Sequence, residues 1–249
     1  MIHRAVPKLA VLVPTRGRVA SCAEMLSTAL RDAKELEHVT FYLGVDGDDP
    51  ALGFNGASGA TYTEMVDQFM GFPGFVELRV VKSGKTVSEI WNELAGVAVL
   101  RGADILLMGN DDQRYETEGW DLRFRQVHGQ HEDGVYVAWC DDGMNGAYRC
   151  AFPAVSRRWY ETLGYFAPEE GFRFFYNDTW IHDLGGRVHR LRYMPDVRVR
   201  HSHFTEGGVR DATTLRNRSD GQSADDRRRW EETEKVRVAH AQVLRGVMR

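Results

Sequence analysis

The sequence predicts an α/β protein in which helices cover both faces of a mainly parallel β-sheet. First, short apolar stretches alternate four times with helix signals along the N-terminal half of the chain. Second, the chain has 249 residues, 43% of them hydrophobic, which is enough for one large core. Third, no internal repeat, low-complexity segment or clear linker divides it. We therefore expect one main domain followed by a C-terminal extension.

Four apolar stretches have the character of buried strands. They are residues 9–13, 39–45, 75–81 and 105–108. Each of the four is followed by polar turn residues. This order is typical of strands that run parallel to one another and are joined by helices.

Three helices are expected to begin at a Ser or Thr that is followed three residues later by a Glu, the spacing of a capping box. The pairs are Ser21 with Glu24, Thr61 with Glu64, and Thr86 with Glu89. The third pair opens the clearest amphipathic helix, because the apolar residues between 87 and 98 fall on one helical face.

Beyond residue 115 the regular alternation stops. Helices are expected at residues 120–128, 156–163, 177–184 and 225–248, and Gly185 and Gly186 are expected to end the third of them. Strands are expected at residues 135–140, 147–152, 187–193 and 197–203. Residues 205–224 are polar and contain glycine, so we expect a long surface loop there.

The composition excludes several classes of protein. No run of about 18 apolar residues exists, so no helix is expected to span a membrane. The apolar run at residues 9–13 is too short for the core of a signal peptide. Cys22, Cys140 and Cys150 are odd in number and lack CxxC spacing, which predicts reduced thiols and no zinc site. We expect a cytoplasmic protein of a bacterium or a phage-infected host cell.

The formal net charge of −4 conceals an uneven distribution. Residues 187–249 contain 15 Lys and Arg against 9 Asp and Glu, a net charge of +6, which leaves −10 for the rest of the chain. The basic C-terminal quarter suits an anionic partner such as a diphosphate, a nucleic acid or a membrane surface. The alternative interpretation is a solvated helical face.

The turn after the fourth predicted strand carries Asn110, Asp111 and Asp112. Open α/β sheets bind their ligands at the carboxyl ends of strands. Carboxylate oxygens placed there suit Mg²⁺ or Mn²⁺ holding a diphosphate. The alternative is a solvated turn, because Asn, Asp and Gly are ordinary turn residues.

Four motifs in order resemble those of nucleotide-sugar-dependent glycosyltransferases with the Rossmann-like GT-A fold, family-2-like. The motifs are VPTRGR at residues 13–18, VDGDD at 45–49, NDD at 110–112 and ND at 177–178. The resemblance covers about residues 8–205. It implies a GT-A-like catalytic domain over residues 1–205 and a C-terminal loop and helix extension over residues 206–249.

The resemblance also implies a nucleotide site. It places Asp46 on the nucleotide base, where an ionised carboxylate can accept a hydrogen bond from uracil or guanine. The alternative for Asp46 is a turn-forming Asp before Gly. Lys85 follows the third strand and lies beside the nucleotide, but Arg79 breaks the glycine spacing of an NTPase phosphate loop. The expected contacts to base and ribose are Pro14, Thr15 and Arg16.

The same resemblance implies a divalent metal, Mn²⁺ or Mg²⁺, held by Asp112. Asn110 stands where the family motif has its first Asp, so Asn110 and Asp111 are expected on the nucleotide. His201 and His203 alternate on a predicted strand and are expected as further metal ligands. The alternative is a structural histidine pair.

Asp178 matches the family's catalytic base, which takes a proton from the acceptor hydroxyl in an inverting transfer. The alternative is that Asp178 is an ordinary N-cap, because Asp is common there. The expected donor is a nucleoside-diphosphate sugar, with a UDP-sugar favoured. The acceptor is a glycan, a lipid-linked sugar, a protein or a modified DNA base.

Three rival functions keep the fold. One is a phage-type DNA-base glycosyltransferase, but no interleaving of aromatic and basic residues marks a nucleic-acid groove. Another is a nucleotidyltransferase, which usually has more glycine after its first strand than residues 14–18 contain. The last is a non-catalytic module that binds a nucleotide sugar.

Overall fold

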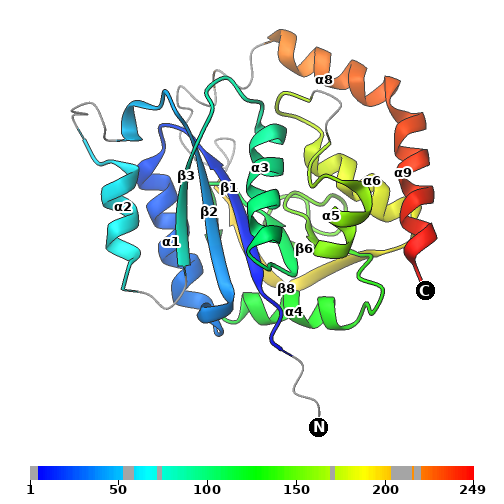
Figure 1. Cartoon of the computed structure of the whole chain (residues 1–249), viewed down its shortest axis with the longest axis horizontal. Coiled ribbons are helices and arrows are strands. Elements are labelled where there is room, and N and C mark those ends of the chain that lie inside the picture. Colours follow the sequence, from blue (N-terminus) through cyan, green and yellow to red (C-terminus); the bar gives the residue numbers. More distant parts are fainter. Residues whose placement is uncertain (1–4, 53–58, 72–74, 169–171, 203–214, 216–219) are drawn as a thin grey trace.

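The computed structural model describes residues 5–52, 59–71, 75–168, 172–202, 215 and 220–249. Its centre is an eight-stranded sheet in the order β3-β2-β1-β4-β7-β6-β8-β5, with helices on both faces (Figure 1). Because all but two of these strands run in one direction, the prediction of a mainly parallel α/β sheet is confirmed.

The N-terminal half supplies four adjacent parallel strands. These are β1 (Leu9–Thr15), β2 (Val39–Asp46), β3 (Phe75–Val81) and β4 (Ile105–Met108). The helices that connect them are α1 (Val19–Asp32), α2 (Tyr62–Phe69) and α3 (Val87–Leu100), with short 3-10 turns at Leu36–His38 and Pro50–Leu52. Side chains on every strand of this half are buried, as the apolar runs predicted.

The second half adds the other four strands, of which β7 and β5 run antiparallel to their neighbours. The strands are β5 (Gln113–Tyr115), β6 (Val137–Asp141), β7 (Ala154–Ser156) and β8 (Leu191–His201). The helices are α4 (Trp120–Gly129), α5 (Arg157–Leu163), α6 (Asn177–Arg187), α8 (Asp220–Glu232) and α9 (Glu234–Val247).

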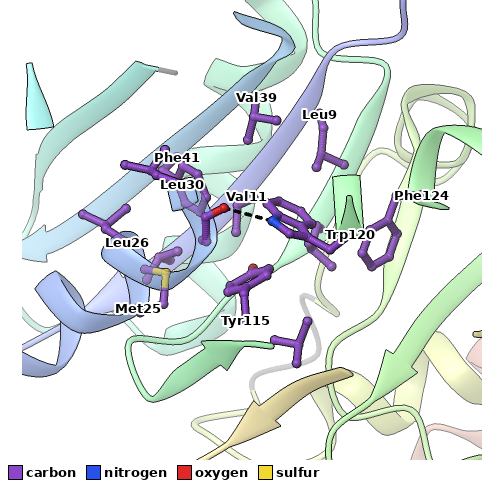
Figure 2. Close-up of a cluster of buried hydrophobic side chains, with 14 of the residues drawn as sticks. Leu9, Val11, Met25, Leu26, Leu30, Val39, Phe41, Tyr115, Trp120 and Phe124 are labelled. Atoms are coloured by element: carbon purple, nitrogen blue, oxygen red, sulfur yellow. Dashed lines mark hydrogen bonds between the residues drawn. The ribbon is translucent and has the colours of Figure 1, made fainter. Parts of the chain in front are cut away.

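Each face of the sheet has its own apolar core. Helices α1, α2 and α4 cover one face, and α3, α5, α6 and α9 cover the other. In the first core the fully buried Trp120 packs 4.5 Å from the Tyr115 ring, and its indole N–H donates to the Ala29 carbonyl at 3.0 Å (Figure 2). Burying this indole satisfies its only donor, so it carries no polar cost.

Two of the three predicted capping boxes are confirmed, those of Thr61 with Glu64 and Thr86 with Glu89. The third is wrong, because α1 begins at Val19, upstream of Ser21. The Ser21 hydroxyl instead donates to the Asp111 carbonyl at 2.8 Å. A tertiary partner has therefore replaced the local cap.

Several other predictions are wrong. Residues 147–152 form no strand, and the pairing with β4 is made by β7 instead. The two strands predicted between residues 187 and 203 are one strand, β8, which absorbs a register shift beside β6. Helix α6 continues through Gly185, which was expected to end it. The glycine is there for close packing, since a Cβ at this position would lie 2.7 Å from Leu191 and Val137 side-chain atoms. The C-terminal helix is two helices that meet at Thr233, and the first begins at Asp220, within the loop predicted for residues 205–224. Most of the rest of that predicted loop lies outside the described residues.

The C-terminal helices join the second core. Ala241 and Leu244 of α9 are buried there, and α9 packs against α5 and α6. Figure 1 shows α8 running into α9 on the side of the molecule that holds α5 and α6. In the described part of the chain no helix has the length and apolarity needed to cross a bilayer. All three cysteines are buried and free.

Candidate active site

The carboxyl ends of several parallel strands meet at one edge of the sheet. Strands β1, β2 and β4 end there in Thr15, Asp46 and Met108, and their following loops carry three of the four quoted motifs. Strand β8 runs in the same direction and ends in His201. The topology thus gathers residues that lie up to about 190 positions apart in the sequence.

Asp111 ties the loop after β4 to the loop after β1. Its carboxylate accepts from the Thr15 hydroxyl at 2.7 Å and from the Arg18 guanidinium at 3.1 Å. The residue is 4% exposed, so it does not belong to a solvated turn. Burial and the neighbouring charge of Asp112 raise the pKa of Asp111 to about 6, against the opposing effects of Arg18 and Thr15.

Asp112 faces the end of β8. Its Oδ2 lies 3.4 Å from His201 Nε2 and 3.8 Å from Arg18 Nη1. Burial pushes the pKa of Asp112 upward, but the hydrogen bond and charge of His201 hold it below its ordinary value. For His201 burial works in the opposite direction, and Asp112 raises its pKa above the usual range. The pair therefore favours a charged carboxylate beside a protonated imidazole.

The loops after β1 and β2 are joined by a second ion-pair group. Arg16 Nη1 donates to Asp46 at 2.9 Å and to Asp48 at 2.5 Å. The backbone N–H of Gly17 donates to Asp49 at 2.7 Å. These contacts leave the buried Oδ1 of Asp46 without a hydrogen-bond partner in the described structure. An unsatisfied buried acceptor is costly, so this atom is suited to a ligand that brings an N–H donor.

Asp178 lies in the first turn of α6, but it is not the N-cap. Tyr176 holds that position, and one Asp178 oxygen accepts from the Thr179 backbone N–H at 2.7 Å. The other oxygen is 3.4 Å from Arg149 Nη2. Burial raises the pKa of the Asp178 carboxyl, although Arg149 opposes this effect. The alternative that Asp178 is the helix N-cap is therefore wrong.

Arg149 reaches Asp178 from a loop that the buried Asp142 organises. Asp142 accepts from the backbone N–H groups of Met144 and Asn145 at 3.0 and 2.7 Å. Its own carbonyl accepts from the His201 backbone N–H at 3.0 Å. The loop that carries Arg149 is thus anchored to the same strand end that faces Asp112.

Six of the predicted site residues are joined through direct contacts into two groups, one around Asp111 and one around Arg16. The six are Thr15, Arg16, Asp46, Asp111, Asp112 and His201. Pro14 lies in β1, and the Asn110 backbone N–H donates to Gln113 at 2.9 Å. The Lys85 amine pairs with Glu93 of α3. His203 lies outside the described residues.

Four residues at the site received no role from the sequence: Arg18, Tyr62, Asp142 and Arg149. Arg18 stands in the same motif as Arg16, and Asp142 lies between the strands predicted at 135–140 and 147–152, so both positions carry a local signal. Nothing local marks Tyr62, whose hydroxyl lies 2.9 Å from the Thr15 hydroxyl across 47 residues of sequence. Only the packing of α2 against the site reveals it.

The donor set fits a divalent ion that is shared with a ligand. Among the residues that the structure describes, no three His, Cys, Asp or Glu side chains gather to hold an ion alone. Asp112 and His201 supply two donors, and the buried Asp112 Oδ1 has no hydrogen-bond partner in that part of the chain. Mg²⁺ in proteins commonly takes one or two carboxylates and completes its shell with substrate phosphates and water.

Comparisons with known proteins bear on the fold. No protein-family model matches the chain, and no curated protein matches it in sequence. The structure of TarS 1–349 from S. aureus in complex with UDP superposes with a TM-score of 0.57 at 11% identity, covering 78% of this chain and 61% of that one.

A second solved structure is a mannosyltransferase, PcManGT from Pyrobaculum calidifontis, in complex with GDP-Man and Mn²⁺. It superposes with a TM-score of 0.55 at 14% identity, covering 80% of this chain and 58% of that one. The chain spans only 36% of the longer TarS structure. The chain therefore has the fold of GT-A-type glycosyltransferases, which confirms the fold that the four motifs implied.

Proposed function

We propose that this protein is a metal-dependent, inverting glycosyltransferase that moves a sugar from a nucleoside-diphosphate sugar to an acceptor hydroxyl, with a UDP-sugar favoured. The observation that carries the proposal is the Asp112–His201 pair, which leaves a buried carboxylate oxygen unsatisfied at the ligand-binding edge of the sheet. The structures that share the fold support the reaction class, since they were solved with UDP, with UDP-GlcNAc, or with GDP-Man and Mn²⁺.

The nucleotide lies, in this proposal, over the loops after β1 and β2. Asp46 accepts the base N–H through its unsatisfied Oδ1, while Arg16 holds the other oxygen in place. Thr15 and Asp111 fix the loop after β1 on the loop after β4. Asp111 thus acts on the nucleotide through the backbone it holds, a more indirect role than the contact expected from the motif.

When bound, a divalent ion, Mn²⁺ or Mg²⁺, would stabilise the negative charge that develops on the leaving diphosphate. Asp112 and His201 are the described residues that would hold it. Imidazole binds a metal only when neutral, so His201 must release its proton for this role. Arg18 lies 3.8 Å from Asp112 and adds a fixed positive charge on the same side.

Asp178 is the proposed base. Its raised pKa makes it a better proton acceptor than an ordinary Asp, and Arg149 holds its second oxygen. As the acceptor hydroxyl attacks the anomeric carbon, its proton passes to Asp178 while the sugar–phosphate bond breaks. One displacement of this kind inverts the anomeric configuration.

The test is a thermal-shift panel of UDP, GDP, ADP, CDP and dTDP, each with and without Mn²⁺. A nucleotide at 100 times its Kd adds roughly 2.7 kcal/mol of stability, which is readily measured. We expect a metal-dependent shift with UDP that Asp112→Asn abolishes and that the half-exposed control Asp225→Asn retains. No shift with any nucleotide, or an unchanged shift in Asp112→Asn, would contradict the proposal.

The reaction itself is tested with UDP-sugars and candidate acceptors. Release of UDP together with a product of opposite anomeric configuration, read by proton NMR, is the expected result. Retained configuration would refute the inverting mechanism. Pyrophosphate release from a nucleoside triphosphate would identify a nucleotidyltransferase instead, and binding without any product would identify a non-catalytic module.

A further inference from the structure

Helix α8 clamps the backbone that leads into the helix of Asp178. The Asp226 carboxylate accepts from the consecutive backbone N–H groups of Arg173, Phe174 and Phe175, at 3.0, 3.1 and 2.8 Å. Asp226 is fully buried. Successive N–H groups that converge on one carboxylate form an anion-binding nest, and a charged acceptor makes such bonds roughly twice as strong as neutral ones.

The residue after this nest has a strained backbone. Tyr176 has φ 70°, the left-handed region that a residue with a bulky side chain rarely adopts. Its ring stacks on Trp230 of α8, with centroids 5.5 Å apart and planes 18° apart. A conformation of this kind persists only where its surroundings hold it, and here α8 contacts both the backbone before Tyr176 and the Tyr176 ring.

Trp230 is itself held in place from α9. The buried Arg237 guanidinium lies 3.5 Å from the Trp230 ring centre and donates to Asp183 of α6 at 3.0 Å. At the end of the segment, Ser88 of α3 donates to the Asn177 side chain at 2.6 Å. Residues 173–177 are thus held by contacts from two helices, α8 and α3, immediately before Asp178.

We propose that Asp226 is a positioning residue for Asp178, a role that rests on the proposed function above. It holds the nest 173–175, Trp230 holds the strained Tyr176, and together they set where the first turn of α6 places its carboxylate. The clamp lies in the segment beyond residue 205, outside the part of the chain that resembles the glycosyltransferase family. The C-terminal helices are in this view part of the acceptor side of the active site.

The test compares Asp226→Asn with Asp225→Asn. The two residues are neighbours on α8, but Asp225 is half exposed and pairs only with Arg228 in the described structure. In Asp226→Asn an amide NH₂ group faces backbone donors that need an acceptor. A misplaced catalytic group costs up to about a hundredfold in rate, so we expect kcat to fall by roughly ten- to a hundredfold. The KM for the donor and the Kd for UDP should stay within about twofold of the wild type.

Trp230→Leu is the second variant, because it loosens Tyr176 without touching the nest. It should lower kcat in the same direction, again with unchanged UDP binding. Unchanged kcat in both variants would overturn the proposal. So would a loss of UDP binding in proportion to the loss of kcat, because that outcome identifies the clamp as a general stability contact.

Hydrogen exchange separates this inference from the proposed function. In Asp226→Asn the amides of residues 173–180 should exchange faster, while strands β1 and β4 keep their protection, and Asp225→Asn should show neither change. If the wild-type protein transfers no sugar, the proposed function fails, and the exchange pattern alone decides whether the clamp exists. Faster exchange spread evenly over the sheet, or none at all, would overturn it.

Discussion

Two adjacent carboxylates at the end of β4 have opposite environments. Asp111 points inward to Thr15 and Arg18, and its pKa is raised, whereas Asp112 faces His201 and its pKa is lowered. Neighbouring titratable groups whose pKa values are pushed apart are typical of sites that assign them different tasks. Here one carboxylate builds the loop and the other is available to a ligand.

The raised pKa of Asp111 predicts a pH dependence of stability. Because its folded-state pKa of about 6 exceeds the unfolded value, the folded chain binds this proton more tightly. The contribution is fully present below the unfolded pKa and is lost as the pH rises through about 6. Asp111→Asn should therefore lose more stability relative to wild type at pH 5 than at pH 7.5, as measured by urea unfolding. A difference that is the same at both pH values would contradict the assignment.

Asp178→Asn should separate binding from chemistry. The amide cannot accept the proton, and loss of a general base costs roughly 10²- to 10⁴-fold in rate. UDP binding with Mn²⁺ should be unchanged in calorimetry. We expect no rescue by Asp183 of the same helix, because its Oδ2 already accepts from Arg187 at 2.6 Å and from Arg237 at 3.0 Å. Full transfer activity in Asp178→Asn would remove this residue from the mechanism.

At the scale of elements, the predictions succeeded where the signal is local. The capping boxes at Thr61 and Thr86 and the four apolar strands depend on neighbouring residues, and all are confirmed. They failed where a distant partner decides. Ser21 is drawn to Asp111, and β5 forms because β8 pairs with it. The same holds at the candidate site: motifs lie in the loops after β1, β2 and β4, whereas no local pattern points to Tyr62, which only a distant contact brings to Thr15.

Gly185 shows how packing overrides a local stop signal in α6. A Cβ at Gly185 would lie 2.7 Å from side-chain atoms of Leu191 and Val137, whereas one at Gly186 would meet its nearest atom at 3.8 Å. Gly185→Ala should destabilise the protein by about 1–3 kcal/mol through overpacking. Gly186→Ala, the matched control, should be neutral or slightly stabilising, because Ala favours helix. Equal urea midpoints for the two variants would show that β8 and β6 yield at this contact.

At the scale of the whole molecule, the sequence marks the two halves of the proposed site unequally. Strands β1, β2 and β4 are followed by the loops that we propose for the nucleotide, and the motifs mark these loops because each one directly follows its strand. The proposed acceptor side is assembled from α6, the loop that carries Arg149, and α8. No motif spans these pieces, and only the fold brings them together.

The C-terminal helices provide the remaining test, because the sequence predicted residues 206–249 as an extension. Leu244 is fully buried in the second core, whereas its neighbour Val243 is 48% exposed. If α9 is integral to the domain, Leu244→Ala should lower the free energy of unfolding by about 2–5 kcal/mol. Val243→Ala should change it by less than about 0.5 kcal/mol.

The shape of the unfolding curve then shows whether α9 unfolds together with the rest of the domain or separately from it. A buried helix that shares a core with α5 and α6 unfolds with them, so fluorescence and circular dichroism should report one coincident transition in wild type and in both variants. A separate early transition that Leu244→Ala shifts alone would make α8 and α9 an independent appendage. That result would also weaken the clamp on Asp178, because Asp226 could not hold the first turn of α6 from a helix that detaches below the global transition.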